Sequence, residues 1–170
     1  MTDKKSLRAE KLALRLQISP AMREDAALKA KDIFLRAVPL KGHEIIAGYT
    51  PMKGEIDDLP LLCHLLDKGH RCVLPLVTGA DEPLSFHAWG DTSSLLTPDV
   101  IITPLLAFDR DCHRLGFGGG HYDRTFAHLK QGLKVGFAYD MQLTEKIPAL
   151  AHDVKLDMVV TEKNVYKGTS

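Results

Sequence analysis

HEIIAGYTPMKGEIDDLPLLCHLLDKGHRCVLPLV, residues 43–77, is the stretch that decides the fold class. Its first eight residues, HEIIAGYT at 43–50, predict a strand. A helix is predicted over residues 57–68, where leucines recur at helical spacing until Gly69 closes the segment. Residues 71–77, RCVLPLV, predict a second strand. Strand, helix and strand in this order form a βαβ unit, which implies a parallel sheet.

The segments on either side continue the alternation of helices and strands. The sequence predicts helices over 5–17, 20–37 and 121–130, and further strands over 84–89, 99–106, 133–139 and 156–161. The first helix has Leu7, Leu12, Leu14 and Leu16 among its apolar positions, and the strand over 84–89 is expected near a sheet edge. No repeat or long linker divides the chain. We therefore expect one domain, residues 1–170, with a three-layer α/β/α fold and a mostly parallel, Rossmann-like sheet.

Composition narrows the class of protein. Lys plus Arg and Asp plus Glu both number 22, and the hydrophobic share is 45%. A balanced charge offers no excess of cations for a nucleic-acid backbone or an anionic membrane, so we expect neither partner. The N-terminus has no uninterrupted apolar core of a signal peptide, and no stretch has transmembrane length, which predicts a cytoplasmic protein. Three cysteines without a CxxC pair indicate buried or incidental thiols.

A glycine-rich stretch, RLGFGGGHYDR at residues 114–124, is the main candidate for a binding loop. Glycines allow positive φ and close approach to a ligand, and the helix that follows offers free N–H groups to an anion. Arg114 and Arg124 add positive charge, so the loop is typical of a phosphate cradle. It matches neither GxGxxG, because His121 stands where the third glycine belongs, nor GxxxxGK[ST]. A flexible turn without a ligand is the alternative reading of the glycines alone.

In an open α/β sheet the ligand normally lies beyond the carboxyl ends of the strands. Four segments meet that condition: residues 50–55, residues 108–122, the region around Tyr139, and AHDVKLD at residues 151–157. We expect the chemistry there.

Four blocks together resemble the 5-formyltetrahydrofolate cyclo-ligase family, also called methenyltetrahydrofolate synthetase. PLLAFDRDCHRLGFGGGHYDR, residues 104–124, is similar to the family's glycine signature, and KKSLR, residues 4–8, to its N-terminal K-x-x-L-R. Glu55 matches an acidic residue in the turn after the first strand, and HDVKLD, residues 152–157, matches an element before the last strand. Gly119 and His121 depart from a common form, in which lysine and an aromatic residue stand.

The resemblance implies roles for individual residues. It implies that ATP is bound by Lys4, Lys5, Ser6, Leu7, Arg8, Arg114, Leu115, Gly116, Phe117, Gly118, Gly119, Gly120, His121 and Tyr122. It implies that the folate is bound by Thr50, Glu55 and Tyr122, that Arg114 and Tyr122 are catalytic, and that Asp123 and Asp153 hold Mg²⁺, with Asp157 as the competing carboxylate. Without the resemblance, Lys4 and Arg8 are solvated helix charges and Glu55 is a turn carboxylate in water.

The function that the resemblance implies is ATP- and Mg²⁺-dependent conversion of 5-formyltetrahydrofolate to 5,10-methenyltetrahydrofolate, through a phosphorylated formyl group. An absent nucleophile–base pair in the sequence agrees with this, because phosphoryl transfer depends mainly on positioning and on neutralising charge. The substrates are then small molecules. Two alternatives are a nucleotide- and folate-binding module of the same fold without turnover, and an interaction protein whose glycine loop binds nothing.

Overall fold

A computed structural model describes residues 3–169. Its helices are α1 (Lys4–Leu16), α2 (Pro20–Ala37), α3 (Leu59–Asp67) and α4 (His121–His128), with a 3₁₀ turn η1 (Asp140–Gln142). Its strands are β1 (Ile45–Ala47), β2 (Arg71–Leu76), β3 (Ser85–Ala88), β4 (Asp91–Leu95), β5 (Val100–Thr103), β6 (Ala107–Phe108), β7 (Arg114–Leu115), β8 (Leu133–Phe137), β9 (Met158–Val160) and β10 (Val165–Lys167).

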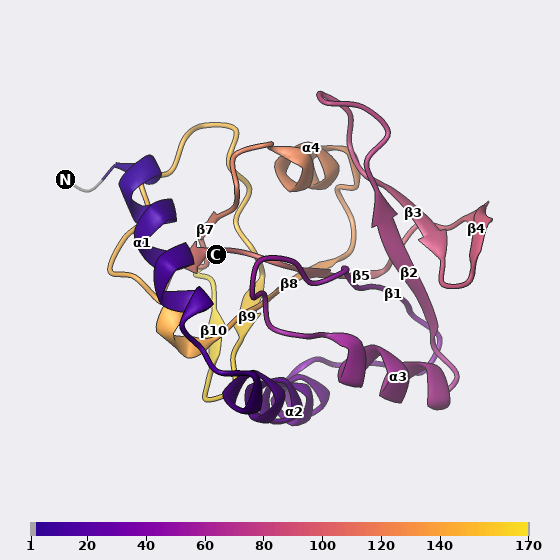
Figure 1. Ribbon diagram of the computed structural model, residues 1–170. Coiled ribbons are helices and arrows are strands. Elements are labelled where there is room, and N and C mark those ends of the chain that lie inside the picture. Colours follow the sequence, from indigo (N-terminus) through magenta and orange to yellow (C-terminus); the bar gives the residue numbers. More distant parts are fainter. Residues whose placement is uncertain (1–2, 170) are drawn as a thin grey trace.

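The main sheet has the strand order β10-β9-β8-β5-β1-β2-β3-β4. The five central strands, from β9 to β2, are parallel, and the remaining strands pair antiparallel at the two edges. Helices cover both faces, with α2 and α3 on one side and α4 on the other (Figure 1). The prediction of an α/β fold with a mostly parallel sheet between helical layers is confirmed.

Two apolar cores flank the sheet, as the buried strand β5 illustrates. Val100 and Ile102 pack with Phe34 of α2 in one core, while Ile101 packs with Phe126 of α4 in the other. All four residues of β5 are buried, which accounts for the continuous apolar run in the sequence.

Strands β1 and β5 lie side by side in the middle of the sheet, and the connections that follow them cross opposite faces of the sheet. After β1 it passes through α3 on one face to β2, and after β5 it passes through α4 on the other face to β8 (Figure 1). Their carboxyl ends therefore open a crevice at the switch point of a doubly wound sheet, where such folds bind ligands. Thr50 and Pro104 lie just beyond these two strand ends.

The sequence missed four short strands. β4 is polar and largely exposed at a sheet edge, so it has no apolar alternation to reveal it. β6 and β7 form a small separate hairpin, because Pro104 ends β5 at Thr103, earlier than the predicted residue 106. The predicted last strand is followed by β10, whose antiparallel pairing with β9 extends the sheet.

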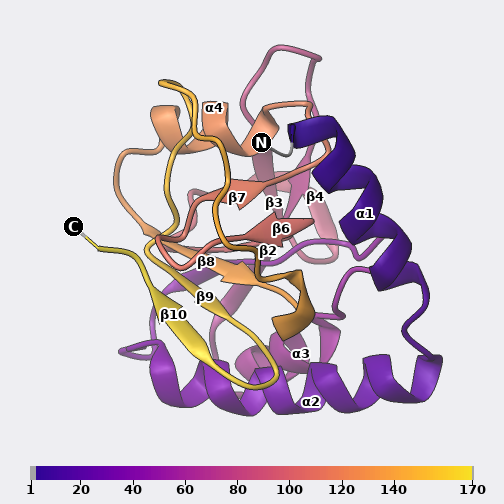
Figure 2. The ribbon, with the colours of Figure 1, turned by 90° about the vertical axis from the view of Figure 1, so that its left-hand side faces the viewer.

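Helix α1 packs differently from the leucine pattern. Leu14 and Leu16 are exposed, whereas Lys11 and Arg15 are buried together with Leu7. Figure 2 shows α1 along one side of the molecule, from the level of α4 down toward α2. Its inward face is therefore cationic. Across residues 3–169, no helix has both the length and the apolar character needed to span a membrane.

Candidate active site

A cavity of about 510 Å³ opens beyond the carboxyl ends of β1 and β5. Its walls come from the start of α1, the β1–α3 turn, the glycine loop with the start of α4, and the loop before β9. The lining residues are Lys4, Arg8, Tyr49, Thr50, Met52, Glu55, Pro75, Val77, Leu84, Pro104, Leu105, Arg114 to Asp123, Leu150, His152 and Asp153. No serine or cysteine of residues 3–169 is part of this lining, so a Ser- or Cys-based nucleophile is not available in its wall.

The glycine loop runs from β7 to the first residue of α4. Gly118 has φ +105° and Gly120 has φ +70°, conformations that L side chains rarely adopt. Gly120 is also the residue that caps α4, and no side chain makes a capping hydrogen bond to the first N–H groups of this helix. The loop therefore presents backbone donors directly to a ligand, as an anion cradle requires.

Arg114 lies almost enclosed beneath this loop. Its Nη2 is 3.2 Å from Oδ1 of Asp123, and its guanidinium carbon is 5.5 Å from the centre of the Tyr122 ring. Burial lowers the pKa of Arg114 and the charge of Asp123 works to raise it, while an arginine stays protonated in either case. Its buried Nε has no hydrogen-bond partner. Arg114, a residue of the cavity wall, thus has one unpaired donor.

Helix α1 folds back over the cavity and brings two cations to it. Nζ of Lys4 is 2.7 Å from Oδ2 of Asp153, and Nε of Arg8 donates to the carbonyl of Gly116 at 2.8 Å. Burial works to raise the pKa of Asp153, but the hydrogen bonds from Lys4 and from the Leu150 N–H outweigh it, so this pKa lies below its ordinary value. Asp153 is therefore held as a carboxylate.

The opposite wall is the β1–α3 turn. Glu55 is 8% exposed, and its Oε2 accepts a hydrogen bond from the Met52 N–H at 3.0 Å. Burial raises the pKa of Glu55, and that N–H together with Arg15 and Lys53 limits the rise. Thr50 is exposed at the end of β1 and lines the cavity with it. A carboxylate and a hydroxyl here face the cationic glycine loop across one cavity.

The carboxylates of Asp123 and Asp153 are of the ligand type that suits Mg²⁺. Both carboxylates line the cavity, and each is paired with one cation, Arg114 or Lys4. Mg²⁺ prefers oxygen ligands, and it is commonly bound by one or two carboxylates while phosphate oxygens and water fill its other positions. The competing carboxylate, Asp157, points elsewhere: it accepts from the Lys134 N–H at 2.7 Å and is not part of the cavity wall.

A second acidic cluster, Asp109, Asp111 and His113, lies outside the cavity. Both oxygens of Asp109 are already occupied, because they accept from the N–H groups of Asp111, His113 and Ile147 and contact the His113 ring. Asp109 therefore organises the turn between β6 and β7 rather than offering free ligand atoms.

The chain is similar in sequence to enzymes that act on a folate. The family model described as the 5-formyltetrahydrofolate cyclo-ligase family matches residues 77–162. A 5-formyltetrahydrofolate cyclo-ligase from Escherichia coli K12 is 32% identical over 90% of this chain and 97% of its own length. One from Mycolicibacterium smegmatis is also 32% identical, over 95% of this chain and 94% of its own.

The chain belongs to the 5-formyltetrahydrofolate cyclo-ligase family. Solved structures agree: a 5,10-methenyltetrahydrofolate synthetase from Mycoplasma pneumoniae superposes with a TM-score of 0.85 at 29% identity, covering 95% of this chain and 100% of that one. A second, from Aquifex aeolicus, gives a TM-score of 0.78 at 33% identity over 98% and 95%. The predicted family is confirmed, and membership makes this chain an enzyme of the ligase class.

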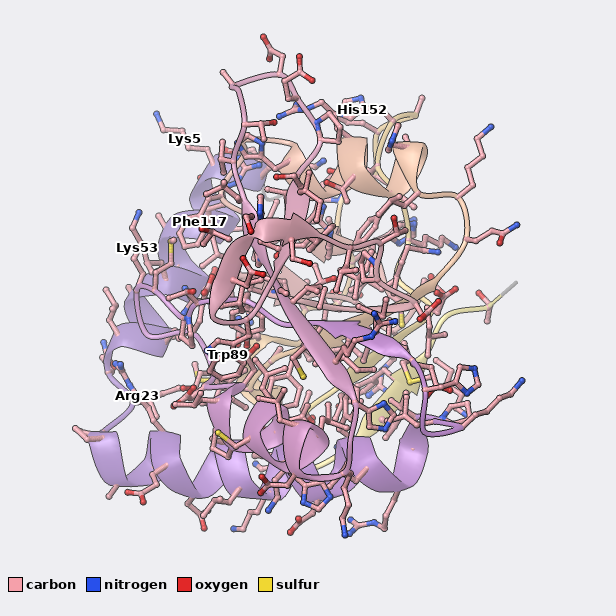
Figure 3. All side chains as sticks on the ribbon, turned by 90° about the vertical axis from the view of Figure 1, so that its right-hand side faces the viewer. Lys5, Arg23, Lys53, Trp89, Phe117 and His152 are labelled. Carbon is pink, nitrogen blue, oxygen red and sulfur yellow. The ribbon has the colours of Figure 1, made fainter. Side chains whose placement is uncertain are left out.

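Most residues assigned through the cyclo-ligase resemblance are brought together in the cavity. Exceptions lie on α1: Lys5 and Ser6 are exposed outside the wall, where Ser6 bonds to Asp3 at the helix start. Leu7 is buried in a small core with Ala107, Leu115 and Ile147. Figure 3 shows the Lys5 side chain extending away from the body of the molecule. The ATP-binding role of these three residues stays a prediction.

Two further residues of the glycine motif have definite positions in the structure. Arg124 turns away from the cavity and donates to the carbonyls of Ala80 and Gly119 at 2.8 and 2.7 Å. His121 lines the cavity while its Nδ1 lies 3.4 Å from the Glu82 carbonyl and 3.3 Å from Arg124. The loop over residues 80–82 therefore braces the start of α4.

Several apolar wall residues have no individual role in the site predicted from the sequence. They are Met52, Pro75, Val77, Leu84, Leu105 and Leu150. Met52 and Phe117 are more than two-fifths exposed, at 57% and 42%, so both are accessible as ligand contacts as well as surface residues. The position of Pro104 and Leu105 after a buried strand is the signal that identifies them in a doubly wound sheet.

A second cavity, of about 720 Å³, lies between α2, α3 and Trp89 and shares Tyr49, Thr50 and Glu55 with the first. Asp58 lines it; this side chain is 1% exposed, and burial raises its pKa to about 7. Its Oδ2 accepts from the Tyr49 N–H at 2.8 Å, and its Oδ1 has no partner. A buried acid, Asp58, therefore hydrogen-bonds to the backbone just before the turn that carries Glu55.

Proposed function

We propose that this family member uses ATP and Mg²⁺ to convert 5-formyltetrahydrofolate into 5,10-methenyltetrahydrofolate, releasing ADP and phosphate. The observation that carries the proposal is the 510 Å³ cavity, in which two chemically different walls face one another. One wall offers backbone donors and the cations Lys4, Arg8 and Arg114, which suit phosphate groups. The other offers the Glu55 carboxylate, which suits the N–H donors of a pteridine ring.

The reaction needs little acid–base chemistry from the protein. The formyl oxygen on N5 attacks the γ-phosphorus of ATP, and the bond to ADP breaks. The phosphorylated formyl group is then attacked by N10, and phosphate leaves with the former formyl oxygen as the ring closes and N10 gives up its proton. A poor leaving group has become a good one, and no serine or cysteine is required in the described cavity wall.

The residues of this chain hold the two substrates in position and neutralise the negative charge of the phosphates. The glycine-loop N–H groups and Arg114 bind the phosphates, and Arg114 with Tyr122 lies nearest the reacting groups, between the phosphate wall and the folate wall. Arg8 is fixed to the loop through the Gly116 carbonyl, so it approaches the phosphates at a set position. Preorganised positive charge of this kind stabilises phosphoryl transfer without rearrangement.

Asp123 and Asp153 are the proposed magnesium ligands. When bound, the ion neutralises phosphate charge and orients the γ-phosphate. Before it binds, Lys4 neutralises Asp153, as the 2.7 Å ion pair indicates. On the folate wall, Thr50 and Glu55 orient the pteridine so that its formyl group lies toward the glycine loop.

The binding module without turnover is not favoured, because the relatives that match nearly the whole chain carry the name of an enzyme. Single-domain organisation, a cytoplasmic location and the absence of nucleic-acid partners stay predictions.

The test is a coupled assay with purified protein, ATP, Mg²⁺ and 5-formyltetrahydrofolate, following the methenyl product and ADP together. We expect the two products in equal amounts, and neither when ATP is omitted. Folded protein that binds both ligands yet forms no product would reject turnover and restore the binding module. If calorimetry and thermal shift show that the protein binds neither ligand, the result would favour the alternative of an interaction protein whose glycine loop binds nothing.

A further inference from the structure

Arg15 is a buried cation that the reaction outlined above does not use. It lies in the last turn of α1, three turns beyond Lys4, and is 0% exposed. Among the pairs within 4.0 Å that the structure gives for residues 3–169, none joins Arg15 to a carboxylate, and its Nη2 has no hydrogen-bond partner. A buried guanidinium in this condition costs folding free energy, and a hydrophobic side chain of similar volume would avoid that cost.

The contacts of Arg15 reach the back of three cavity walls. Its Nε donates to the Lys53 carbonyl at 3.0 Å, and its Nη1 donates to the Leu105 carbonyl at 3.0 Å. Its guanidinium carbon is 5.8 Å from the centre of the Phe117 ring, which Lys53 approaches from its own side at 4.7 Å. Figure 3 shows Lys53 and Phe117 close together on the same face. These contacts join the turn of Glu55, the end of β5 and the glycine loop.

Arg15 does not touch the cavity itself, because it is absent from the wall to which Leu105 and Phe117 belong. It can therefore act only through its neighbours. Burial lowers the pKa of Arg15, and Glu55 is the charged group that opposes this most, because the two charges attract one another across the turn. The same attraction favours the ionised form of Glu55.

We propose that Arg15 is a positioning residue that fixes the pteridine-binding turn against the nucleotide-binding loop, so that both substrates meet in one geometry. The proposal rests on the proposed function, since it assumes that a folate binds at Glu55. Helix α1 then has two roles, because it brings Lys4 and Arg8 to the phosphates at one end and sets the folate turn at the other.

Lys11 provides a matched control. It lies one turn before Arg15 on the same inward face, is 8% exposed, and donates to two backbone carbonyls, those of Met141 and Leu143, at 3.1 and 2.9 Å. It therefore docks the same helix by the same kind of bond, but onto η1 instead of the folate turn. If Arg15 merely docks α1, then Arg15→Met and Lys11→Met must behave alike.

The charged groups that surround Glu55 determine what a pH profile reports. Burial raises the pKa of Glu55, and the Met52 N–H, Arg15 of α1 and Lys53 of the same turn limit the rise. Tyr49 at the end of β1, Asp58 at the start of α3 and Tyr122 of α4 all respond to its negative charge. Because burial also raises the pKa of Asp58, to about 7, the profiles are compared in an Asp58→Asn background as well.

The experiment measures steady-state kinetics for both substrates, and direct 5-formyltetrahydrofolate binding by calorimetry, in the wild type, Arg15→Met, Arg15→Lys and Lys11→Met. We expect Arg15→Met to weaken folate binding by about tenfold or more, the effect of one charge-assisted hydrogen bond. Its acidic limb of kcat/KM for the folate should move to higher pH, because Glu55 without this cation stays protonated further up the scale. Arg15→Lys should restore the acidic limb, since the charge returns, but only part of the affinity, since a lysine lacks the fork that reaches both carbonyls.

Lys11→Met should leave the acidic limb of kcat/KM for the folate at its wild-type pH and change folate binding by less than about twofold. Equal effects of Arg15→Met and Lys11→Met on folate binding and on the limb would overturn the positioning role. If Arg15→Met fails to fold, the Arg15→Lys variant decides the question. Wild-type folate affinity in this variant, together with a wild-type acidic limb, would show that the two hydrogen bonds of the guanidinium are not needed. Wild-type protein that binds no folate would instead reject the proposed function.

Discussion

Asp153→Asn separates a metal-binding role from a structural one. In the structure, Oδ2 of Asp153 accepts from Lys4 Nζ at 2.7 Å and from the Leu150 N–H at 2.8 Å, with the two paired side chains 21% and 17% exposed. A partly exposed ion pair of this kind contributes about 0.5–1 kcal/mol after solvent screening. The asparagine carbonyl can still accept from Leu150. We therefore expect the free energy of unfolding to fall by only about 1 kcal/mol.

The magnesium requirement should change far more. Removing one of two proposed carboxylate ligands should raise the Mg²⁺ concentration for half-maximal rate by at least about tenfold, since even outer-sphere changes have effects of that size. The assay is the initial rate of methenyl formation across a Mg²⁺ titration at saturating ATP and folate, with denaturant unfolding in parallel.

Asp157→Asn is the matched control for this prediction. Asp157 likewise accepts from a backbone N–H, that of Lys134, and pairs with Lys134 Nζ at 3.3 Å, but it lies outside the cavity. It should lose a similar amount of stability and keep the wild-type Mg²⁺ curve. A wild-type curve for Asp153→Asn, or the same shift in both variants, would refute the assignment of the metal to Asp153.

Two further substitutions test the walls of the site. Arg114→Ala should weaken binding of a non-hydrolysable ATP analogue by about 1.5–3 kcal/mol, the range for a charged hydrogen bond, and wild-type affinity would remove Arg114 from the phosphate site. Asp58 has a folded-state pKa of about 7 against an ordinary 3.8, so the stability that its protonation contributes is complete below about pH 3.8 and is lost as the pH rises through 7. Asp58→Asn should abolish this fall, of up to about 4 kcal/mol; an unchanged pH dependence of unfolding would show that Asp58 is not its source.

The central sheet was predictable because its signals are local. The apolar run over residues 99–106 and the strand, helix and strand of residues 43–77 each show their period in the sequence. Of the strands that escaped, β4 has five mostly polar residues, β10 has three residues, and β6 and β7 have two each. Their pairing depends on what lies next to them in space, which the sequence alone does not show.

The site divides in the same way. Glycine spacing and the flanking Arg114 and Asp123 are contiguous, so a motif captures them. Lys4 and Asp153 are 149 positions apart in the sequence, so only the family resemblance could predict that both belong to one site. Arg15 escaped entirely, because a charged residue on an amphipathic helix ordinarily faces water, and its burial follows from the backbone carbonyls that it meets in the fold.

The route of the formyl oxygen tests the account most directly. With 5-formyltetrahydrofolate carrying ¹⁸O in its formyl group, the proposed attack on the γ-phosphorus transfers that oxygen to the phosphate that is released. We expect each turnover to yield ADP, methenyl product and inorganic phosphate bearing one ¹⁸O atom from the substrate, as measured by mass spectrometry. Methenyl product accompanied by unlabelled phosphate, or formed without consumption of ATP, would contradict it.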